Sequence, residues 1–246
     1  MKQRLFVTLS LAGLAMATFG ATKPKTAIKS LNKTTIQQPT YTEWHDLQVN
    51  AINRFPLHTN FFTYPADDWV YEKDGKIVSK DILHMNKTES KYFLSLDGTW
   101  KFNWVANADQ RPTDFYKEDL DDSNWKTMNV PGNWEMNGFG DPEYVNNGFA
   151  WRGHFDQQPP AVPTKDNHVG SYRRIIDIPA NWDGKQVIAH FGSVTSNIYL
   201  YVNGKFAGYA EDSKVAAEFD ITPYLKKGKN LIAFQTFRWC DGSWDE

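Results

Sequence analysis

The stretch from Asn197 to Tyr209 constrains the fold of this chain more than any other. It reads NIYLYVNGKFAGY, with two apolar runs on either side of Asn203-Gly204. Both central residues of a tight type I′ turn need a positive φ, which asparagine and glycine tolerate better than other residues. An Asn-Gly pair between two such runs is the strongest short-range signal for a β-hairpin. The stretch therefore predicts two antiparallel strands that meet at residues 203–204.

Further short strands are predicted on both sides of this hairpin. Trp100, Phe102 and Trp104 recur at every second position of SLDGTWKFNW, which gives a strand with one aromatic face. The other predicted strands are VGSYRRIIDI, QVIAHF, AEFDI and NLIAFQTFRW. No helical periodicity of useful length follows residue 95. Strands at intervals of roughly ten residues favour an all-β sandwich over alternating βαβ units.

The amino-acid composition and the net charge exclude some classes of function and are compatible with others. The chain has 246 residues with a net charge of −2, so it lacks the basic excess typical of nucleic-acid binding. Its 15% aromatic content fits a β-rich core, and it also fits sugar binding, in which flat rings stack on pyranoses. Cys240 is the sole cysteine, which excludes an intrachain disulfide and a cysteine-based zinc site. We expect Cys240 to be a small core residue.

The first residues, MKQRLFVTLSLAGLAMATFGA, have the order of a secretory signal. Lys2 and Arg4 precede an apolar run over residues 5–14, and Ala15-Met16-Ala17 offers a cleavage site. The run is short for a membrane span. We therefore predict a signal peptide over residues 1–21, a periplasmic or secreted protein, and no membrane insertion after the signal is removed. A first helix that is amphipathic or buried is the alternative.

Differences in amino-acid composition divide the rest of the chain into a leader, an arm and a sandwich domain. Residues 22–40 are rich in lysine and threonine and are predicted to be a flexible leader. Residues 41–94 mix aromatics, proline and asparagine without clean periodicity, and they predict an irregular N-terminal arm. The sandwich is expected over residues 95–243, with residues 244–246 beyond it. Within it, residues 131–168 carry many glycines and prolines and predict a long structured loop of the kind that often has a function.

Local motifs for catalysis are missing from the sequence. It has no nucleophile elbow, phosphate loop or dinucleotide fingerprint, although spacing alone does not exclude a Ser-His-Asp triad. The adjacent acids Asp67-Asp68 and Asp121-Asp122 do not predict a catalytic pair, because neighbours in a strand point to opposite faces. The segment PTDFYKEDLDDSNW is interpreted as a polar surface segment. Asp212 follows the second strand of the predicted hairpin, at a strand end where ligands are often bound. Its side chain is expected either to cap a turn or to contact a ligand, and spacing alone favours the turn cap.

Several long motifs nevertheless resemble a known family. They are SLDGTWKFNW, VPGNWEMNGFGDPEYVN, PPAVPTKDNHVGSYRR, FGSVTSNIYLYVNGKFAGYAEDSKVAAEFDI and FRWCDGS. In this order they resemble the N-terminal part of glycoside hydrolase family 2, and more narrowly the large bacterial β-galactosidases. The upstream INRFPLHTNFF resembles the arm that precedes the first domain there, so the resemblance covers about residues 41–243. The stretch PPAVPTKDNHVGSY favours the β-galactosidase branch over β-glucuronidase-like and β-mannosidase-like relatives.

The resemblance implies a jelly-roll, galactose-binding-like β-sandwich that precedes an immunoglobulin-like domain and a (β/α)₈ barrel. In this family, two glutamates of the barrel hydrolyse terminal non-reducing β-D-galactose residues with retention. Neither glutamate has a counterpart here, so the chain as given is expected to be inactive alone. Where FRWCDGS ends, the family continues as YLEDQD, whereas this chain continues as Trp244-Asp245-Glu246. We therefore expect the sequence to be a truncated piece of a β-galactosidase.

Two positions carry a role by this resemblance. The asparagine of the family's Y-x-N loop contacts galactose and matches Asn146. The aspartate of G-Y-x-x-D-S contacts galactose and ligates a sodium ion, and it matches Asp212; carboxylate oxygens suit both tasks. The other sodium ligands and a magnesium site belong to the barrel, so no complete metal site is expected in this chain. The implied partners are a β-galactoside and, as is common in the family, further copies of the same chain.

Two other interpretations stay open. A free-standing, non-catalytic carbohydrate-binding module would have the same sandwich and no barrel. A sister activity of the same family would use this domain on another glycoside, because barrel residues decide which sugar is cleaved.

Overall fold

The computed structural model describes the chain in several stretches, namely residues 38–65, 70–79, 86–142, 148, 150–152, 155–156 and 158–244. The predicted signal peptide, most of the predicted leader, Asp67-Asp68 and Asn146 lie outside the described residues. Within these stretches, no helix has the length and apolar character that crossing a membrane requires.

The described residues form strands and short 3₁₀ helices, with no α-helix among them. The strands are β1 (Ala51–Ile52), β2 (Val70–Lys73), β3 (Lys76–Ser79), β4 (Gly98–Val105), β5 (Lys126–Val130), β6 (Val169–Ile178), β7 (Ile188–Phe191), β8 (Asn197–Val202), β9 (Lys205–Glu211), β10 (Ala217–Asp220) and β11 (Gly228–Phe237). The 3₁₀ helices are η1 (Glu43–His45), η3 (Lys87–Glu89), η4 (Ala108–Gln110), η5 (Glu135–Asn137), η6 (Ala180–Trp182), η7 (Thr222–Tyr224) and η8 (Asp241–Trp244).

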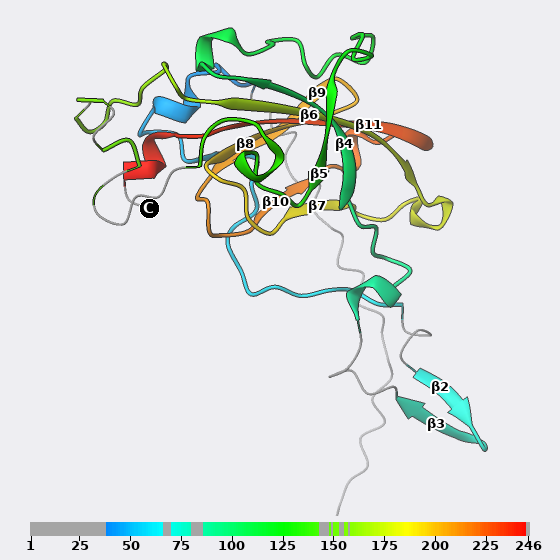
Figure 1. The fold of residues 1–246 in the computed structure, drawn as a ribbon. Coiled ribbons are helices and arrows are strands. Elements are labelled where there is room, and N and C mark those ends of the chain that lie inside the picture. Colours follow the sequence, from blue (N-terminus) through cyan, green and yellow to red (C-terminus); the bar gives the residue numbers. More distant parts are fainter. Residues whose placement is uncertain are drawn as a thin grey trace, which may run out of the picture. The chain divides into compact units, whose positions relative to one another are not determined.

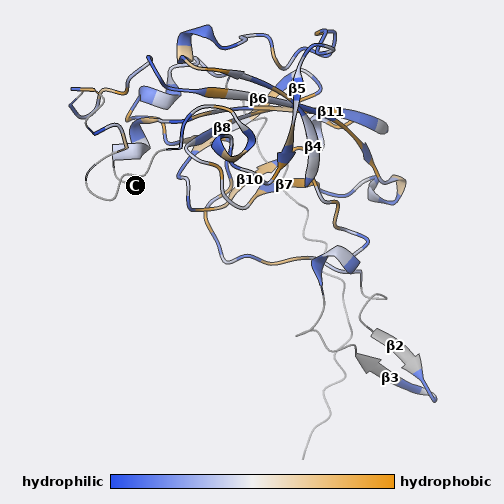
Figure 2. Cartoon of the chain, in the orientation of Figure 1, coloured by the Kyte–Doolittle hydropathy of each residue, from blue (hydrophilic) through white to orange (hydrophobic). Residues whose placement is uncertain are grey.

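One large antiparallel sheet organises the molecule. Its strand order is β1-β9-β8-β11-β6-β4-β5, and the pair β10-β7 forms a second, small sheet that packs on it (Figure 1). The third sheet is the separate hairpin β2–β3. Hydrophobic residues lie along the strands of the two packed sheets, whereas the connecting loops are mostly hydrophilic (Figure 2). The all-β sandwich predicted from the sequence is therefore confirmed for the described residues.

The inner face of the large sheet packs against the small sheet. Trp100 and Phe102 of β4 and Phe234 of β11 meet Phe219 of β10 in one buried cluster. Trp104, two residues further along β4, is half-buried against the same cluster. The aromatic face that the period-two pattern predicted is thus the core face of β4.

The other face of the large sheet is also buried. Tyr199 and Tyr201 of β8 and Phe237 of β11 form a second cluster, which Trp44 of the arm and Phe115 cover. Every residue of β8 is buried, because its alternate side chains enter the two clusters. The aromatic content of the sequence therefore serves two cores.

The hairpin predicted at residues 203–204 is confirmed. Val202 pairs with Lys205 across a two-residue turn, in which φ is 49° at Asn203 and 76° at Gly204. Asn203 is buried, and its side-chain amide donates to the carbonyl of Tyr224 at 2.8 Å. Its Oδ1 accepts the backbone N–H of Leu231 at 2.9 Å. The turn residue thus also connects β8 to β11.

Three elements were not among the predicted strands, namely the short strand β1, strand β5 and the hairpin β2–β3. Strand β5 lies at the edge of the large sheet, and its only buried side chain is Met128. The hairpin β2–β3 lies within the predicted irregular arm and turns at Asp74-Gly75, where φ is 53° and 73°. Asp-Gly is a hairpin signal like Asn-Gly, so the sequence contained a signal for this turn. The flanking residues lack the alternation that identified the other hairpin.

The interpretation of PTDFYKEDLDDSNW as a surface segment was wrong in part. Phe115 is fully buried, and Tyr116 stacks on Tyr201 with ring centroids 4.2 Å apart. Asp122 accepts a hydrogen bond from Nε of the buried Arg173 at 2.7 Å, while Asp121 accepts one from the backbone of Ser123. The two acids therefore stabilise different parts of the fold.

The arm is held on the small sheet by one shared carboxylate. Glu218 of β10 contacts His58 of the arm and His190 of β7, each at 2.7 Å. The carbonyl of Glu218 also accepts the backbone N–H of Phe55 at 2.9 Å. Hydrogen bonds with the Thr59 carbonyl and with Glu218 raise the pKa of His58. Burial alone would raise the pKa of Glu218, but its hydrogen bonds with His190 and His58 outweigh this effect and lower it.

We predict that Asn203→Ala lowers the free energy of unfolding by about 3 kcal/mol, because it leaves several buried backbone and amide groups without partners. Urea denaturation followed by tryptophan fluorescence measures this change. Asp74→Ala is the matched control, since it also replaces a positive-φ residue before glycine, but at an exposed turn. Its cost is expected to be about 1 kcal/mol or less. Equal effects of the two substitutions would contradict the role of the Asn203 side chain.

The arm contact is predicted to depend on pH. Because the pKa of His58 is raised, its protonated form stabilises the contact. This contribution is fully present below the ordinary pKa of 6.5 and is lost as the pH rises through the folded pKa. Because the pKa of Glu218 is lowered, its ionised form also stabilises the contact. This contribution is fully present above the ordinary pKa of 4.5 and is lost as the pH falls through the folded pKa. Amides of residues 55–60 should therefore be best protected between these values in hydrogen exchange, corrected for its intrinsic pH dependence.

The controls for this prediction are two histidine variants. His58→Gln removes the titrating group and should remove most of the loss of protection at alkaline pH. His45→Gln replaces an exposed arm histidine and should leave the pH profile unchanged. Identical profiles for His58→Gln and the unmodified chain would show that this contact does not hold the arm.

Candidate functional site

Strand pairing gathers several loop residues at one end of the large sheet. The last residue of β9, Glu211, pairs with the first residue of β8, Asn197. The last residue of β11, Phe237, likewise pairs with the first residue of β6. The backbone N–H of Phe237 also donates to the side chain of Asn197 at 3.0 Å. The residues just outside these strand ends, which are Asp212, Thr195, Arg238 and His168, therefore lie at the same end of the sheet.

Asp212 has an unusual backbone for its residue type. Its φ is 93°, in the left-handed region that favours glycine. Its side chain is half-buried, and no hydrogen bond or ion pair joins it to another described residue. Only its carbonyl is used locally, as the acceptor for the N–H of Val215 at 3.2 Å. The carboxylate thus does not cap the turn, and strained residues of this kind concentrate at functional sites.

A cavity of about 430 Å³ opens at this end of the sheet. Its volume lies in the range of small-molecule sites. Asp212 itself does not line it, but Lys214, two residues later, does. Pro142 and Gly148 line it too, and they flank the undescribed stretch that contains Asn146. Of the two sequence-predicted residues, Asp212 lies two positions before a residue of the cavity wall, whereas Asn146 lies outside the described residues.

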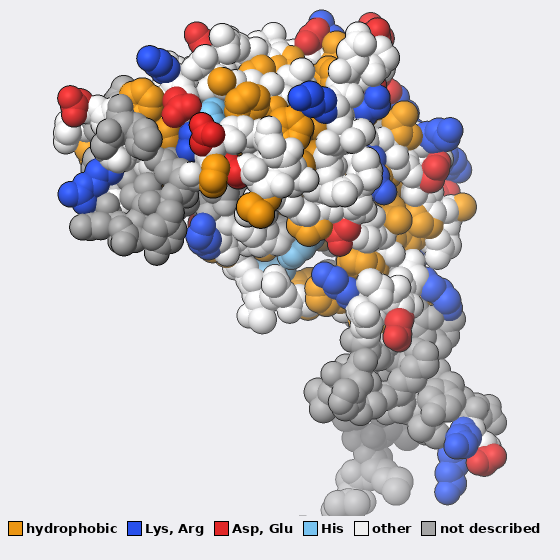
Figure 3. Space-filling model, in the orientation of Figure 1, with side chains coloured by type: hydrophobic (Ala, Val, Ile, Leu, Met, Phe, Trp, Pro, Cys, Tyr) orange, Lys and Arg blue, Asp and Glu red, His pale blue; other side chains and the backbone are white. Residues whose placement is uncertain are grey.

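The walls of the cavity offer polar groups of several kinds. Lys214 and Arg238 are cationic donors, Glu135 is an anionic acceptor, and Asn133 and Thr195 provide an amide and a hydroxyl. A ligand with several hydroxyl groups, each able to donate and accept, would match such a set. On the face of the molecule seen in Figure 3, basic and acidic side chains are interspersed. Local groups, and not a field of one sign, therefore determine what this site selects.

Arg238 is positioned by its neighbours. Its guanidinium lies 3.5 Å from Oδ2 of Asp166 and 4.6 Å from the ring centroid of Trp239. Oδ1 of the same aspartate is 3.0 Å from Nε2 of the buried His168. Burial and the nearby Arg238 lower the pKa of His168, in opposition to Asp166. Asp166 and Trp239 thus hold the guanidinium of Arg238, which is part of the cavity wall.

Aromatic rings close one side of the cavity. Trp239 lines it and packs against Trp151 and Phe155, with ring centroids 5.5 Å and 6.0 Å away. Trp239 is only 3% exposed, and Trp151 is fully buried. These rings therefore support the wall, and neither presents an open face on which a sugar could stack.

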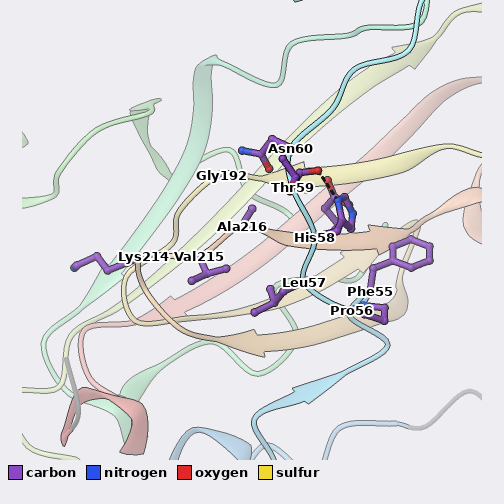
Figure 4. Close-up of a pocket in the computed structure, with 11 residues that line it drawn as sticks. Phe55, Pro56, Leu57, His58, Thr59, Asn60, Gly192, Lys214, Val215 and Ala216 are labelled. Carbon is purple, nitrogen blue, oxygen red and sulfur yellow. Dashed lines mark hydrogen bonds and ion pairs between the residues drawn. The ribbon is translucent and has the colours of Figure 1, made fainter. Parts of the chain in front are cut away.

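A second cavity, of about 350 Å³, lies between the arm and the loop after Asp212 (Figure 4). Its walls are residues 55–60 of the arm, Gly192, Lys214–Ala216 and Glu218. Lys214 lines both cavities, so the loop after Asp212 separates them. We take the larger cavity as the candidate site, because Thr195 and Arg238 of its wall lie at the same end of the sheet as Asp212.

Sequence reasoning missed Glu135 and Arg238. Arg238 is the penultimate residue of a predicted strand, and that position was a usable signal because ligands are reached at strand ends. Glu135 had no comparable signal, since it lies in a loop that only tertiary packing brings to the cavity. Cys240 is buried, as predicted, and its Sγ lies 3.7 Å from the carbonyl oxygen of Ser196.

Comparison with known families gives one match over more than half of the chain. Residues 93–246 match the family described as Glycosyl hydrolases family 2, sugar binding domain. The chain is 35% identical over 207 residues to a β-galactosidase of Priestia megaterium, covering 84% of this chain and 19% of that protein. It is 36% identical over 201 residues to one of Halalkalibacterium halodurans, covering 82% and 18%. The chain thus spans about a fifth of the length of these curated relatives.

Solved structures that resemble the chain include a β-glucuronidase of Bacteroides uniformis. That match has 24% sequence identity and a TM-score of 0.42, and it covers 58% of this chain and 14% of the other. A β-glycosidase of Bacteroides vulgatus matches with 24% identity and a TM-score of 0.41, covering 59% and 18%.

Proposed function

The chain belongs to glycosyl hydrolase family 2, and from this premise we propose that it forms the N-terminal sugar-binding part of an exported β-galactosidase. The curated relatives that match most of its length are named β-galactosidases. We further propose that the sandwich over residues 95–243 has the jelly-roll, galactose-binding-like topology of that family. The substrate proposed for the whole protein is a terminal non-reducing β-D-galactoside.

The observation that carries this proposal is the geometry around Asp212. A half-buried carboxylate without a described partner, on a strained backbone, lies at the end of the sheet where a 430 Å³ cavity opens. Asp212 would accept hydrogen bonds from sugar hydroxyls, and charged acceptors make the stronger bonds of this kind. Asn146 is proposed to contact the same sugar.

The sodium ion that the family resemblance implies fits Asp212 in one respect. A carboxylate that accepts no other hydrogen bond can offer an oxygen to a hard cation. We propose Asp212 as one of its ligands, with the remaining ligands supplied from outside this chain. The implied magnesium ion is likewise assigned to the part of the protein that this chain does not cover.

The hydrolytic step is proposed to lie outside this segment. The chain spans about a fifth of its relatives, and the retaining mechanism needs two carboxyl groups on opposite sides of the glycosidic bond. In this proposal the segment binds and orients the galactosyl group, while two glutamates of a barrel act as acid/base and nucleophile. Assembly of identical chains, common in the family, is part of the same proposal.

We predict that Asp212→Asn impairs galactoside turnover. The test uses a chimera in which residues 41–244 replace the matching segment of the Priestia megaterium β-galactosidase. Hydrogen bonds to a charged group contribute about 1.5–3 kcal/mol, and each 1.4 kcal/mol is about tenfold. We therefore expect kcat/KM for a chromogenic β-galactoside to fall about ten- to a hundredfold, with a weaker dependence on sodium.

Two controls accompany this assay. Asp177→Asn removes an exposed carboxylate from β6 and should leave the kinetics unchanged. The 246-residue chain alone, titrated with galactose by calorimetry, should bind more weakly than roughly 0.1 mM, because a wall of the site is missing. Tighter binding would favour the free-standing carbohydrate-binding module. Unchanged kinetics and sodium dependence in Asp212→Asn would remove Asp212 from the site.

Export is predicted from the first residues of the sequence. Expression of the chain in a Gram-negative host should give periplasmic protein whose N-terminus lies after Ala17 and no later than residue 22. N-terminal sequencing of the periplasmic fraction measures this. Replacing the apolar Leu11 and Leu14 with glutamine should retain the chain in the cytoplasm. Periplasmic protein that still begins at Met1 would contradict a cleaved signal.

A further inference from the structure

Two buried carboxyl groups meet behind the candidate site. Glu211 is the last residue of β9 and is 6% exposed, and Asp241 is the first residue of η8 and is 4% exposed. Their carboxylate oxygens and the Sγ of Cys240 all lie within 4.8 Å of one another. A Cβ on Gly242 would lie 3.3 Å from Oε2 of Glu211, so the glycine leaves space beside this carboxylate.

The described residues do not compensate this pair of acids. Neither side-chain oxygen of Asp241 has a hydrogen-bond donor among them, although both oxygens are buried. Glu211 accepts a short hydrogen bond from the hydroxyl of Tyr209, and the thiol of Cys240 is a second, weaker donor beside it. Within the described stretches, no lysine, arginine or histidine forms an ion pair with either acid. Burying a carboxylate without a partner is costly, and two adjacent negative charges repel each other in a medium of low dielectric.

We propose that Glu211 and Asp241 bind a hard divalent cation of the Ca²⁺ type. Two carboxylates carry the charge that balances such an ion, and carboxylate oxygen is the ligand that it prefers. Oxygens that each lie about 2.3–2.6 Å from one Ca²⁺ are no more than about 5.2 Å apart. The observed spread of 4.8 Å meets this limit. The hydroxyl of Tyr209 fixes the orientation of Glu211 and leaves the carboxylate of Asp241 for the ion.

Cys240 belongs to the group by position. Its Sγ lies 3.7 Å from the carbonyl oxygen of Ser196, within the range of a weak thiol hydrogen bond, and the two carboxylates beside it favour an ion that prefers oxygen. A thiolate ligand would instead favour a softer ion such as Zn²⁺. Asp212 is not a member of the group, so this site is separate from the sodium contact proposed for that residue and does not depend on it.

The cation would connect two strand ends that are distant in the sequence. Glu211 immediately precedes Asp212, and Asp241 follows Arg238 and Trp239 of the cavity wall. Binding between them would tie the loop after β9 to the segment after β11. The ion would therefore stabilise the fold at the end of the sheet that carries the candidate site.

A shared proton is the competing way to balance the two charges. Burial raises the pKa of Glu211 to about 9, with Asp241 adding to the rise and the Tyr209 hydrogen bond opposing it. A protonated Glu211 beside an ionised Asp241 would need no metal. Cation binding and proton sharing differ in their response to added Ca²⁺, which makes them separable by experiment.

The test uses the full 246-residue chain, freed of metal with a chelator and dialysed. Tb³⁺ is added as a luminescent substitute for Ca²⁺, with excitation through nearby tryptophans such as Trp239, which adjoins Cys240 in the chain. We expect saturable Tb³⁺ luminescence that Ca²⁺ displaces, and a thermal unfolding midpoint that rises with Ca²⁺ concentration. Asp241→Asn and Glu211→Gln should each weaken Ca²⁺ binding roughly 100-fold or more, because each removes a charged ligand.

Matched variants make the outcome decisive. Asp109→Asn replaces an exposed carboxylate of η4 and should leave Tb³⁺ and Ca²⁺ binding unchanged. Glu211→Gln keeps a side chain of the same shape next to Tyr209, so it serves if Asp241→Asn fails to fold. The proposal is overturned if Ca²⁺ neither displaces Tb³⁺ nor shifts the unfolding midpoint. It is also overturned if only Zn²⁺ binds and Cys240→Ser abolishes that binding.

Discussion

The long antiparallel pairing of β11 with β6 is the interaction on which the rest of the structure depends. It runs without a break from Gly228 opposite Ile178 to Phe237 opposite Val169, and β8 pairs on the other side of β11. Because alternate side chains of β11 enter opposite cores, a shift of one residue would exchange the contents of the two cores. The register therefore fixes which strand ends coincide, and with them the place of the candidate site.

This fixed strand register also positions the loops that form the candidate site. Asp212, Arg238 and His168 come from different strands, yet they lie at one end of the sheet because the strands beside them are in register. Rigid strands that hold variable loops are a common basis for ligand sites. The left-handed backbone of Asp212 and the ion pair of Arg238 with Asp166 are local features of this end of the sheet, and the side chains of Lys214, Arg238 and Glu135 make the wall of its cavity polar.

Electrostatic compensation differs among the buried charged groups. Arg173 is buried, but Asp122 and two backbone carbonyls satisfy its guanidinium, so it stabilises the fold without further partners. Glu211 and Asp241 are similarly buried, but no cation pairs with either of them among the described residues, and neither oxygen of Asp241 has a hydrogen-bond donor there. This contrast within one sheet is why the acid pair, and not the buried arginine, indicates a bound ion. A cation there would stabilise the same loops that border the proposed sugar site.

The sequence alone determined those features that depend on neighbouring residues. Asn203-Gly204 specified its turn through positive φ, the period-two pattern located β4, and short runs bounded by turn residues located β6, β8, β9 and β11, because these signals are local to the backbone. The tertiary structure determined which residues of distant segments contact one another. Phe115 became a core residue, Asp122 a partner of Arg173, and Glu211 a neighbour of Asp241. Such contacts depend on the pairing of strands far apart in the chain, and no local pattern encodes their distances or their burial.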